Sequence, residues 1–203
     1  MLVFVAGEIA RHEAELNALD AAAGDGDHGI TMRLGFEAIR ERLGQLDPAA
    51  QIDGILRESG TAFLGATGGA IGVVLGKMLM AGGKAMQGAL EMRAPEFRLL
   101  LTAMETSVAA TGKVKPGDRT ILDAIHAAAT AANGSASQDL AGLIDLSATA
   151  AQESARSTAN MLCRVGRASR LGDRVLGHPD AGATSFGIML RAMHDWITSA
   201  QAV

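Results

Sequence analysis

The chain has 203 residues, of which 48% are hydrophobic and only 3% aromatic, with no tyrosine. This length suits one substantial core, and abundant Ala, Leu and Met beside few aromatic side chains favour helices over sheets. The formal net charge of −4 gives no basic field for a nucleic-acid backbone, and the single cysteine, Cys163, excludes an internal disulfide and suits a small core residue. We therefore expect one all-α domain spanning 1–203 that does not bind nucleic acid.

We expect no secretory signal at the start of the chain. The apolar run at 1–6 is short, lacks the basic region of a secretory signal, and is followed by Glu8 and Arg11. No stretch approaches the roughly 20 apolar residues that cross a bilayer. We expect a cytoplasmic protein without membrane contact.

Apolar residues at helical spacing predict eight helices joined by short loops. In chain order these are 3–19, 32–43, 52–64, a buried helix within 65–88, 95–110, 119–132, a helix from 137 or 139 to 163, and 183–197. Glycine-rich or polar loops interrupt the pattern at 24–29 and 166–182. An antiparallel helical bundle or barrel is the simplest architecture, and its loops should hold the chemistry.

Three aspartates crowd into a short glycine-rich turn. Asp20 ends the first predicted helix, and Asp25 and Asp27 follow it directly. Crowded carboxylates suit a hard cation, and Mg²⁺ completes its octahedron with water and substrate phosphates. An EF-hand calcium loop is excluded, because the twelfth position counted from either Asp20 or Asp25 is not acidic. The alternative left open is that these residues cap helices and stabilise the turn.

Two segments offer groups for a phosphate. His28 and Thr31 stand at the start of the second helix, where amides, imidazole and hydroxyl can approach an anion, although both residues also suit an N-cap. The stretch 65–72 leads into an apolar helix through several glycines. It lacks the Gly-Lys-Ser/Thr ending of a Walker A loop, and close helix packing is an equal explanation for its glycines.

Positive charge gathers late in the chain, at Arg164, Arg167, Arg170 and Arg174. Such a cluster suits a polyphosphate or an acidic partner surface, although a single arginine is usually a solvated charge. Arg167 is the residue of this group that we expect to contact a ligand.

Taken together, the motifs resemble the L subunit of dihydroxyacetone kinase and the equivalent nucleotide domain of single-chain dihydroxyacetone kinases. The similarity covers nearly the whole chain. It is carried by the segments 16–20, 24–29, 68–70, 117–120, 166–169, 177–178 and 180–185.

The resemblance implies a closed antiparallel eight-helix barrel in which two Mg²⁺ ions join the phosphates of ADP or ATP to Asp20, Asp25 and Asp27. It also implies a kinase subunit that is inactive alone and phosphorylates a small ketose held on a partner K subunit. The ketose is dihydroxyacetone or another such as erythrulose. The implied nucleotide contacts are His28, Gly29, Ile30, Thr31, Ala70, Ile71, Gly112, Ile121, Arg167, Asp180, Ala181 and Gly182.

The chain departs from the family pattern at three positions. Ile71 replaces a serine that faces the phosphates, Ala181 replaces a proline, and Arg119 stands where some members have lysine. The sequence leaves open whether ATP donates directly or a held ADP is rephosphorylated by a phosphotransferase-system M subunit. It also leaves open a homodimer, a plain metal-binding helical bundle, and a non-catalytic nucleotide sensor that docks on a transcription regulator.

Overall fold

In the computed structural model, the backbone is described for residues 1–201, and side chains for the same residues except 167, 168, 170, 171 and 201. Every regular element in this range is a helix, as the composition predicts. The α-helices are α1 (Leu2–Arg11), α2 (Glu13–Ala21), α3 (His28–Leu43), α4 (Ile52–Ala66), α5 (Gly69–Ala85), α6 (Ala94–Gly112), α7 (Ile121–Gly134), α8 (Leu140–Ser157) and α9 (Ala181–Gln201). Two 3₁₀ helices, η1 (Thr158–Asn160) and η2 (Arg167–Val175), lie between α8 and α9.

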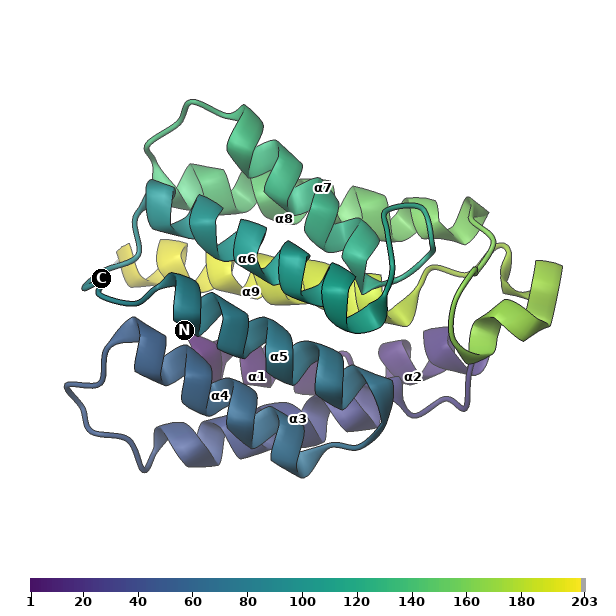
Figure 1. The fold of residues 1–203 in the computed structure, drawn as a ribbon, viewed down its shortest axis with the longest axis horizontal. Coiled ribbons are helices and arrows are strands. Elements are labelled where there is room, and N and C mark those ends of the chain that lie inside the picture. The colour runs from purple at the N-terminus through teal and green to yellow at the C-terminus, as the bar shows by residue number, and fades with distance from the viewer. Residues whose placement is uncertain (202–203) are drawn as a thin grey trace.

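The α-helices close into a ring. α1 packs against α3, each helix from α3 to α8 packs against the next, and α9 returns to α1. α1 and α2 together form one broken helix, so eight helical segments make up the wall within the described range (Figure 1). The predicted closed antiparallel eight-helix barrel is therefore confirmed.

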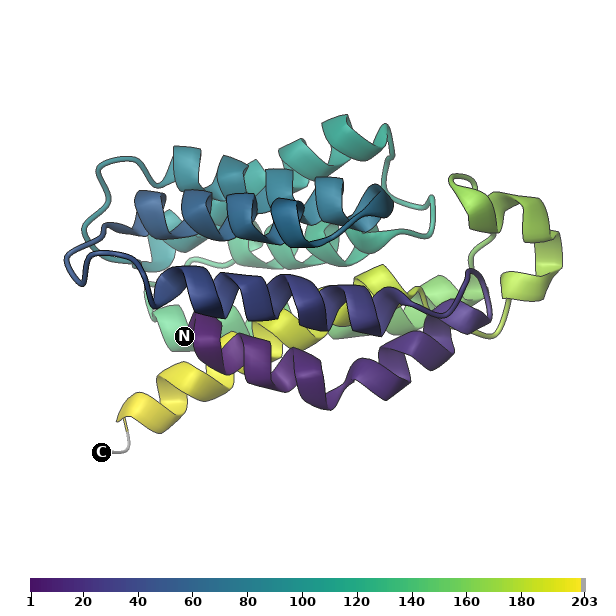
Figure 2. The same ribbon diagram turned by 90° about the horizontal axis from the view of Figure 1, so that it is seen from below.

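The up-and-down order brings alternate connections to the same end of the barrel. The connections α2–α3, α4–α5, α6–α7 and α8–α9 all lie at one end, which we call the rim. Figure 2 shows the segment 158–180 projecting beyond the barrel at this end. The motifs at 20–29, 65–72 and 166–182 all lie in or beside these connections. Topology thus places distant motifs at one rim.

The first helix breaks at His12, which the hydrophobic periodicity did not predict. The amide of His12 donates to the carbonyls of both Glu8 and Ile9, at 3.2 and 3.1 Å. Such a bifurcated hydrogen bond to residues i−4 and i−3 is common at the end of a helix, and here it marks the C-terminus of α1. α2 starts at the next residue and contacts both α3 and α9, so the break bends the chain around the barrel.

Two predicted boundaries were wrong near the rim. α7 begins at Ile121 and not at Arg119, because Thr120 forms a capping box with Asp123: the Thr120 side chain accepts from the amide of Leu122, and Asp123 accepts from the amide of Thr120. α8 ends at Ser157 and not at residue 163. The chain leaves α8 through a 3₁₀ turn whose Thr158 hydroxyl accepts the amide of Asp180, a tertiary contact that periodicity does not reveal.

The glycines of α5 have two different roles. A Cβ on Gly60 of α4 would lie 2.5 Å from the carbonyl oxygen of Gly76 on α5, so these two helices approach closely at glycines. Gly68 and Gly69, in contrast, have open space around them and Gly69 has a φ of 71°. Packing therefore explains the glycines inside α5, whereas those at its start belong to the rim.

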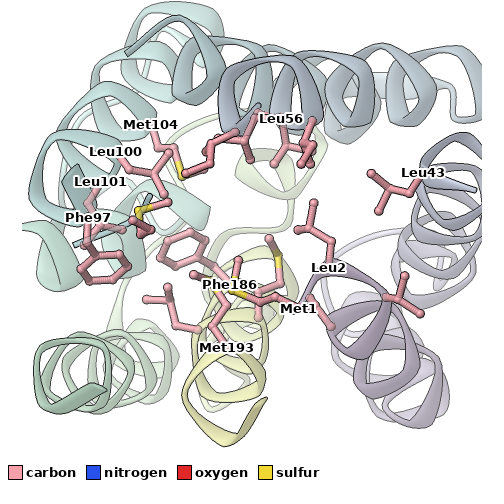
Figure 3. Close-up of a pocket in the computed structure, with 18 residues that line it drawn as sticks. Met1, Leu2, Leu43, Leu56, Phe97, Leu100, Leu101, Met104, Phe186 and Met193 are labelled. Atoms are coloured by element: carbon pink, nitrogen blue, oxygen red, sulfur yellow. The ribbon is translucent and has the colours of Figure 1, made fainter. Parts of the chain in front are cut away.

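The core is formed largely by alanine, leucine and methionine, with few aromatic contacts. Phe36 and Phe63 meet edge to face across α3 and α4, with ring centroids 5.8 Å apart. Inside the barrel, toward the end opposite the rim, a cavity of about 330 Å³ is lined by aliphatic, methionine and phenylalanine side chains (Figure 3). No helix in the described range is long and apolar enough to cross a bilayer.

Candidate functional site

The three predicted aspartates meet at the rim. One carboxylate oxygen from each of Asp20, Asp25 and Asp27 lies within 4.8 Å of the other two. Oxygens on opposite sides of one Mg²⁺ are about 4.2 Å apart, since each metal–oxygen bond is about 2.1 Å. The cluster therefore has the donor type that Mg²⁺ prefers, and its spread is comparable to the width of one Mg²⁺ coordination shell.

Asp20 also organises the loop that carries the other two carboxylates. Its Oδ2 accepts the amides of Gly26 at 2.8 Å and Asp27 at 3.1 Å. Gly26 has a φ of 79°, a left-handed conformation that glycine adopts without strain. Asp20 lies in the last turn of α2, where the helix dipole disfavours negative charge. A cation at this cluster would remove that conflict.

His28, the first residue of α3, is buried and neutral. Its Nε2 lies 3.2 Å from the Ser185 hydroxyl, which donates its own proton to the carbonyl of Gly182 at 2.9 Å. The hydroxyl must therefore accept from Nε2, which places the imidazole proton there. Burial lowers the pKa of His28 to about 4, against the opposing charge of Asp20. The imidazole thus has no proton left for a phosphate oxygen, and a phosphate contact here would use backbone amides.

A cavity of about 660 Å³ joins the aspartate cluster to the glycines at the start of α5. Asp20, Asp25, Asp27, His28, Thr31 and the stretch 68–71 line it. Gly68 is the N-cap of α5 and provides no side-chain cap, so the first amides of α5 are available to an anion. The positive end of the α5 dipole and the three carboxylates line one cavity, which suits a phosphate bridged by a cation.

A second cavity of about 270 Å³ adjoins the first. Both are lined by Asp20, His28, Ala70 and Ile71. The second cavity extends from there between the starts of α7 and α9 and the segment after η1. Its further lining includes Ala23, Val74, Arg119, Thr120, Ile121, Cys163, Val165, Asp180, Ala181 and Gly182. The larger cavity is polar and would suit the phosphates of a nucleotide. The smaller cavity beside it is more apolar and would suit the base and ribose.

Comparison with known proteins identifies the family. Residues 22–195 match the profile of the DAK2 domain. The chain belongs to the DAK2 domain family. The ADP-binding subunit DhaL of a PEP-dependent dihydroxyacetone kinase from Escherichia coli is 34% identical over 190 residues, covering 92% of this chain and 90% of that protein.

Several other relatives are longer proteins. A D-erythrulose kinase of Mycolicibacterium smegmatis is 34% identical over 96% of this chain, which spans 34% of that enzyme. Human triokinase/FMN cyclase is 33% identical over 92% of this chain, which spans 32% of it. The crystal structure of the C. freundii dihydroxyacetone kinase with AMP-PNP and Mg²⁺ aligns over 96% of this chain and 33% of its own, with a TM-score of 0.75 and 24% identity. This structural likeness confirms the fold.

The structure places most predicted site residues of this DAK2 domain around the two cavities. Those that line them are Asp20, Asp25, Asp27, His28, Thr31, Ala70, Ile71, Ile121, Asp180, Ala181 and Gly182. The side chain of Arg167 lies outside the described part of the structure, although its backbone begins η2. Nucleotide and metal binding by these residues remain predictions.

Three predicted residues do not line either cavity. Gly29 packs against α2, where an added Cβ would collide with the carbonyl of Glu13. The amide of Ile30 donates to Asn17 Oδ1 at 3.1 Å and is therefore already occupied. Gly112 ends α6 and lies against Val114.

Several residues of the smaller cavity were not predicted from the sequence. Cys163, expected in the core, is half-buried and lines this cavity, and its Sγ donates to the carbonyl of Val165. Thr120 and Arg119 line it as well. Both residues belong to the 117–120 motif, which could have indicated a role in the site. The sequence around Val165 and Val74 gives no such indication.

Proposed function

We propose that the chain, as one domain spanning 1–203, is the nucleotide-binding part of a kinase for a small ketose and holds Mg-ATP or Mg-ADP at the rim. The observation that carries this proposal is the convergence of three carboxylates with the uncapped start of α5 in one cavity. Carboxylates cannot bind phosphates directly, so their proximity to an anion-binding helix end calls for a bridging cation.

Each group then has a chemical role. Asp20, Asp25 and Asp27 would hold Mg²⁺, two ions by the family resemblance, which would neutralise the charge of the transferring phosphate. Amides at Ala70 and Ile71 would orient the phosphates. Residues 180–182 and Ile121, which line the smaller cavity, would enclose the base and ribose. His28 supports the start of α9 through Ser185. Phosphoryl transfer depends on positioning and charge stabilisation, so no catalytic base is needed in this chain.

The ketose and its site belong to a partner in this proposal. The E. coli relative is named as a separate ADP-binding subunit, and the chain spans about a third of the single-chain kinases that it matches. We infer that a K subunit holds dihydroxyacetone or, as in the relatives named for it, erythrulose. The name of the E. coli relative also supports an ADP that is recharged from PEP through an M subunit.

Calorimetry with purified wild-type protein tests the nucleotide site. Mg-ADP should bind with one nucleotide per chain, and ADP with EDTA should bind at least about 10-fold more weakly. Equal affinity with and without Mg²⁺ would contradict the metal assignment. No nucleotide binding under either condition would reject the proposed function.

A second candidate function rests on Ile71. This side chain lines both cavities where the family has a serine hydroxyl, so one phosphate contact is missing. A nucleotide sensor without catalytic activity would tolerate this loss. Mg-ADP binding together with absence of phosphate transfer in the presence of a cognate K subunit would favour the sensor.

A further inference from the structure

Arg119 is an unusual residue for a protein interior. It is only 1% exposed and is the largest fully buried side chain in the described range. Its Nη2 donates to two main-chain carbonyls, those of Val175 at 3.1 Å and His178 at 2.7 Å. Both acceptors belong to the segment that returns from η2 to α9. The guanidinium therefore joins the start of α7 to the end of the projecting segment 158–180.

This arrangement is costly to the fold. Arg119 has a left-handed φ of 61°, which strains a residue with a side chain. Its Nε is buried without a hydrogen-bond partner, and no carboxylate among the described residues forms an ion pair with it. A residue selected for stability alone would not combine these features. The cost points to a role at the neighbouring cavity, which Arg119 lines.

The turn around Arg119 holds both ends of the projecting segment. On the outgoing side, the amide of Arg164 donates to the carbonyl of Asp118 at 3.4 Å. On the returning side, Arg119 binds the carbonyls described above. Asp180 lies two residues after His178. Its main-chain amide donates a hydrogen bond to the Thr158 hydroxyl at 2.8 Å, which fixes its position. The wall of the smaller cavity at 180–182 thus depends on where the turn holds residues 175–178.

We propose that Arg119 is a positioning residue that holds the segment 175–178, and through it residues 180–182, against the nucleotide cavity. The proposal rests on the proposed nucleotide function. Arg119 does not touch the reacting atoms; it acts through the main chain of the segment that forms the cavity wall. Arginine suits this task because its planar guanidinium presents several donors in a fixed arrangement and keeps its charge when buried.

The chain contains a matched control at the opposite end of the barrel. Arg98 also binds main-chain carbonyls, with Nε donating to Ala132 at 2.9 Å and Nη2 donating to Ser135 at 2.9 Å. Arg98→Met removes a comparable set of bonds far from the rim. Any general effect of losing an arginine that binds carbonyls should appear in both Arg98→Met and Arg119→Met.

The test compares wild type, Arg119→Met, Arg119→Lys and Arg98→Met by hydrogen exchange without ligand and by Mg-ADP calorimetry. Arg119→Met should accelerate exchange of the Gly177 and Asp180 amides at least about 10-fold and weaken Mg-ADP by about 10-fold. Arg119→Lys, which keeps the charge and donors, should recover part of both. Arg98→Met should change neither, although it lowers the melting temperature. Should Arg119→Met not fold, Arg119→Gln, which keeps a shorter donor, replaces it with the same expectation.

The two readouts separate the possible failures. Unchanged exchange at Gly177 and Asp180 would overturn the proposal, because the tether would not hold the segment. Faster exchange with unchanged Mg-ADP affinity would also overturn it, since the segment would not position the nucleotide. Equal losses of Mg-ADP affinity in Arg119→Met and Arg98→Met would also overturn the proposal, because Arg119 would then contribute only to the general stability of the fold. Absence of Mg-ADP binding by the wild type would instead reject the proposed function on which this inference rests.

Discussion

At the scale of single residues, a substitution of Asp27 is the most direct test of the proposed metal site. Asp27→Asn keeps the side-chain shape and removes one of three clustered charges. We expect Mg-ADP affinity to fall by at least about 10-fold, because even outer-shell partners of a metal ligand contribute about 10- to 100-fold. Calorimetry measures the change. Asp47→Asn, at an exposed turn, is the control and should bind as wild type does. Equal affinity in both variants would contradict the metal assignment.

Ile71 tests the departure from the family pattern. Ile71→Ser places a hydroxyl where both cavities meet, so Mg-ADP should bind more tightly by about 0.5 to 1.5 kcal/mol, the usual net value of one hydrogen bond. Val73→Ser, exposed on the same helix and away from both cavities, should leave the affinity unchanged. Weaker binding in Ile71→Ser would show that this chain has reshaped its phosphate loop.

Asp180 links the site to the pH dependence of stability. Burial raises the pKa of Asp180 to about 6, with Asp123 and Asp20 adding to the rise and the Ala183 amide and Arg119 opposing it. The folded state therefore binds the proton more tightly than the unfolded state. As pH rises from about 4 to 6, ionisation of this carboxyl lowers the free energy of unfolding. Above pH 6 the whole of this destabilisation is present.

Asp180→Asn should remove this cost while its side-chain oxygen still accepts the Ala183 amide. Without nucleotide or Mg²⁺, the variant should be more stable than wild type at pH 7.5, by at most about 3 kcal/mol for a shift of about two pKa units. The difference should vanish near pH 4. Urea unfolding at the two pH values measures it. Equal stability at pH 7.5 would mean that the charged carboxylate is well solvated or compensated.

At the scale of elements, the close packing of α4 and α5 sets the shape of the barrel wall. Gly60→Ala should destabilise the protein by about 1 to 3 kcal/mol, because the added methyl meets the Gly76 carbonyl and the helices must separate. Gly54→Ala in the same helix meets no atom and should stabilise by up to about 1 kcal/mol through helix propensity. Chemical denaturation distinguishes the two. Similar effects of both substitutions would argue against a close approach at Gly60.

The sequence predicted elements well where periodicity was strong and poorly where tertiary contacts set the boundary. The helices from α3 to α7 and α9 follow from apolar spacing, and the meeting of three carboxylates follows from three aspartates close in sequence. The end of α8 is accompanied by a contact with a distant segment, that of Thr158 with Asp180, and the break at His12 is a local change of main-chain bonding within an amphipathic stretch. The smaller cavity was partly missed for the same reason, since Cys163 and Val74 come together only in the folded barrel.

At the scale of the whole molecule, alternation of helix direction explains why the site lies at one end. α3, α5, α7 and α9 all begin at the rim, so their positive dipole ends surround the cavities. The C-terminal ends of α2, α4, α6 and α8 alternate with them, which limits the net field. The proposed phosphate would therefore be selected by specific amides and by a cation held on the carboxylates, more than by a general positive potential.

The proposed partner requirement is consistent with this layout. The aspartate cluster lies at the rim with Asp25 and Asp27 exposed, and phosphoryl transfer requires the acceptor hydroxyl in line with the phosphate. The larger cavity, about 660 Å³, is proposed for the phosphates and metal, and the smaller one for the remainder of the nucleotide. A small ketose would then approach from the open side, held by another protein.

Alone, the chain should therefore not phosphorylate dihydroxyacetone. Mixed with a cognate K subunit and a source of phosphate, either ATP or a PEP-dependent relay, it should form the ketose phosphate, and Asp27→Asn should abolish this product. Arg164 and Arg174, both exposed beside the rim, would favour an acidic partner surface, so activity at low K concentration should fall as salt rises. Product formation by the purified chain alone would contradict the division of labour, even if Mg-ADP binding and the Asp27 effect were as expected.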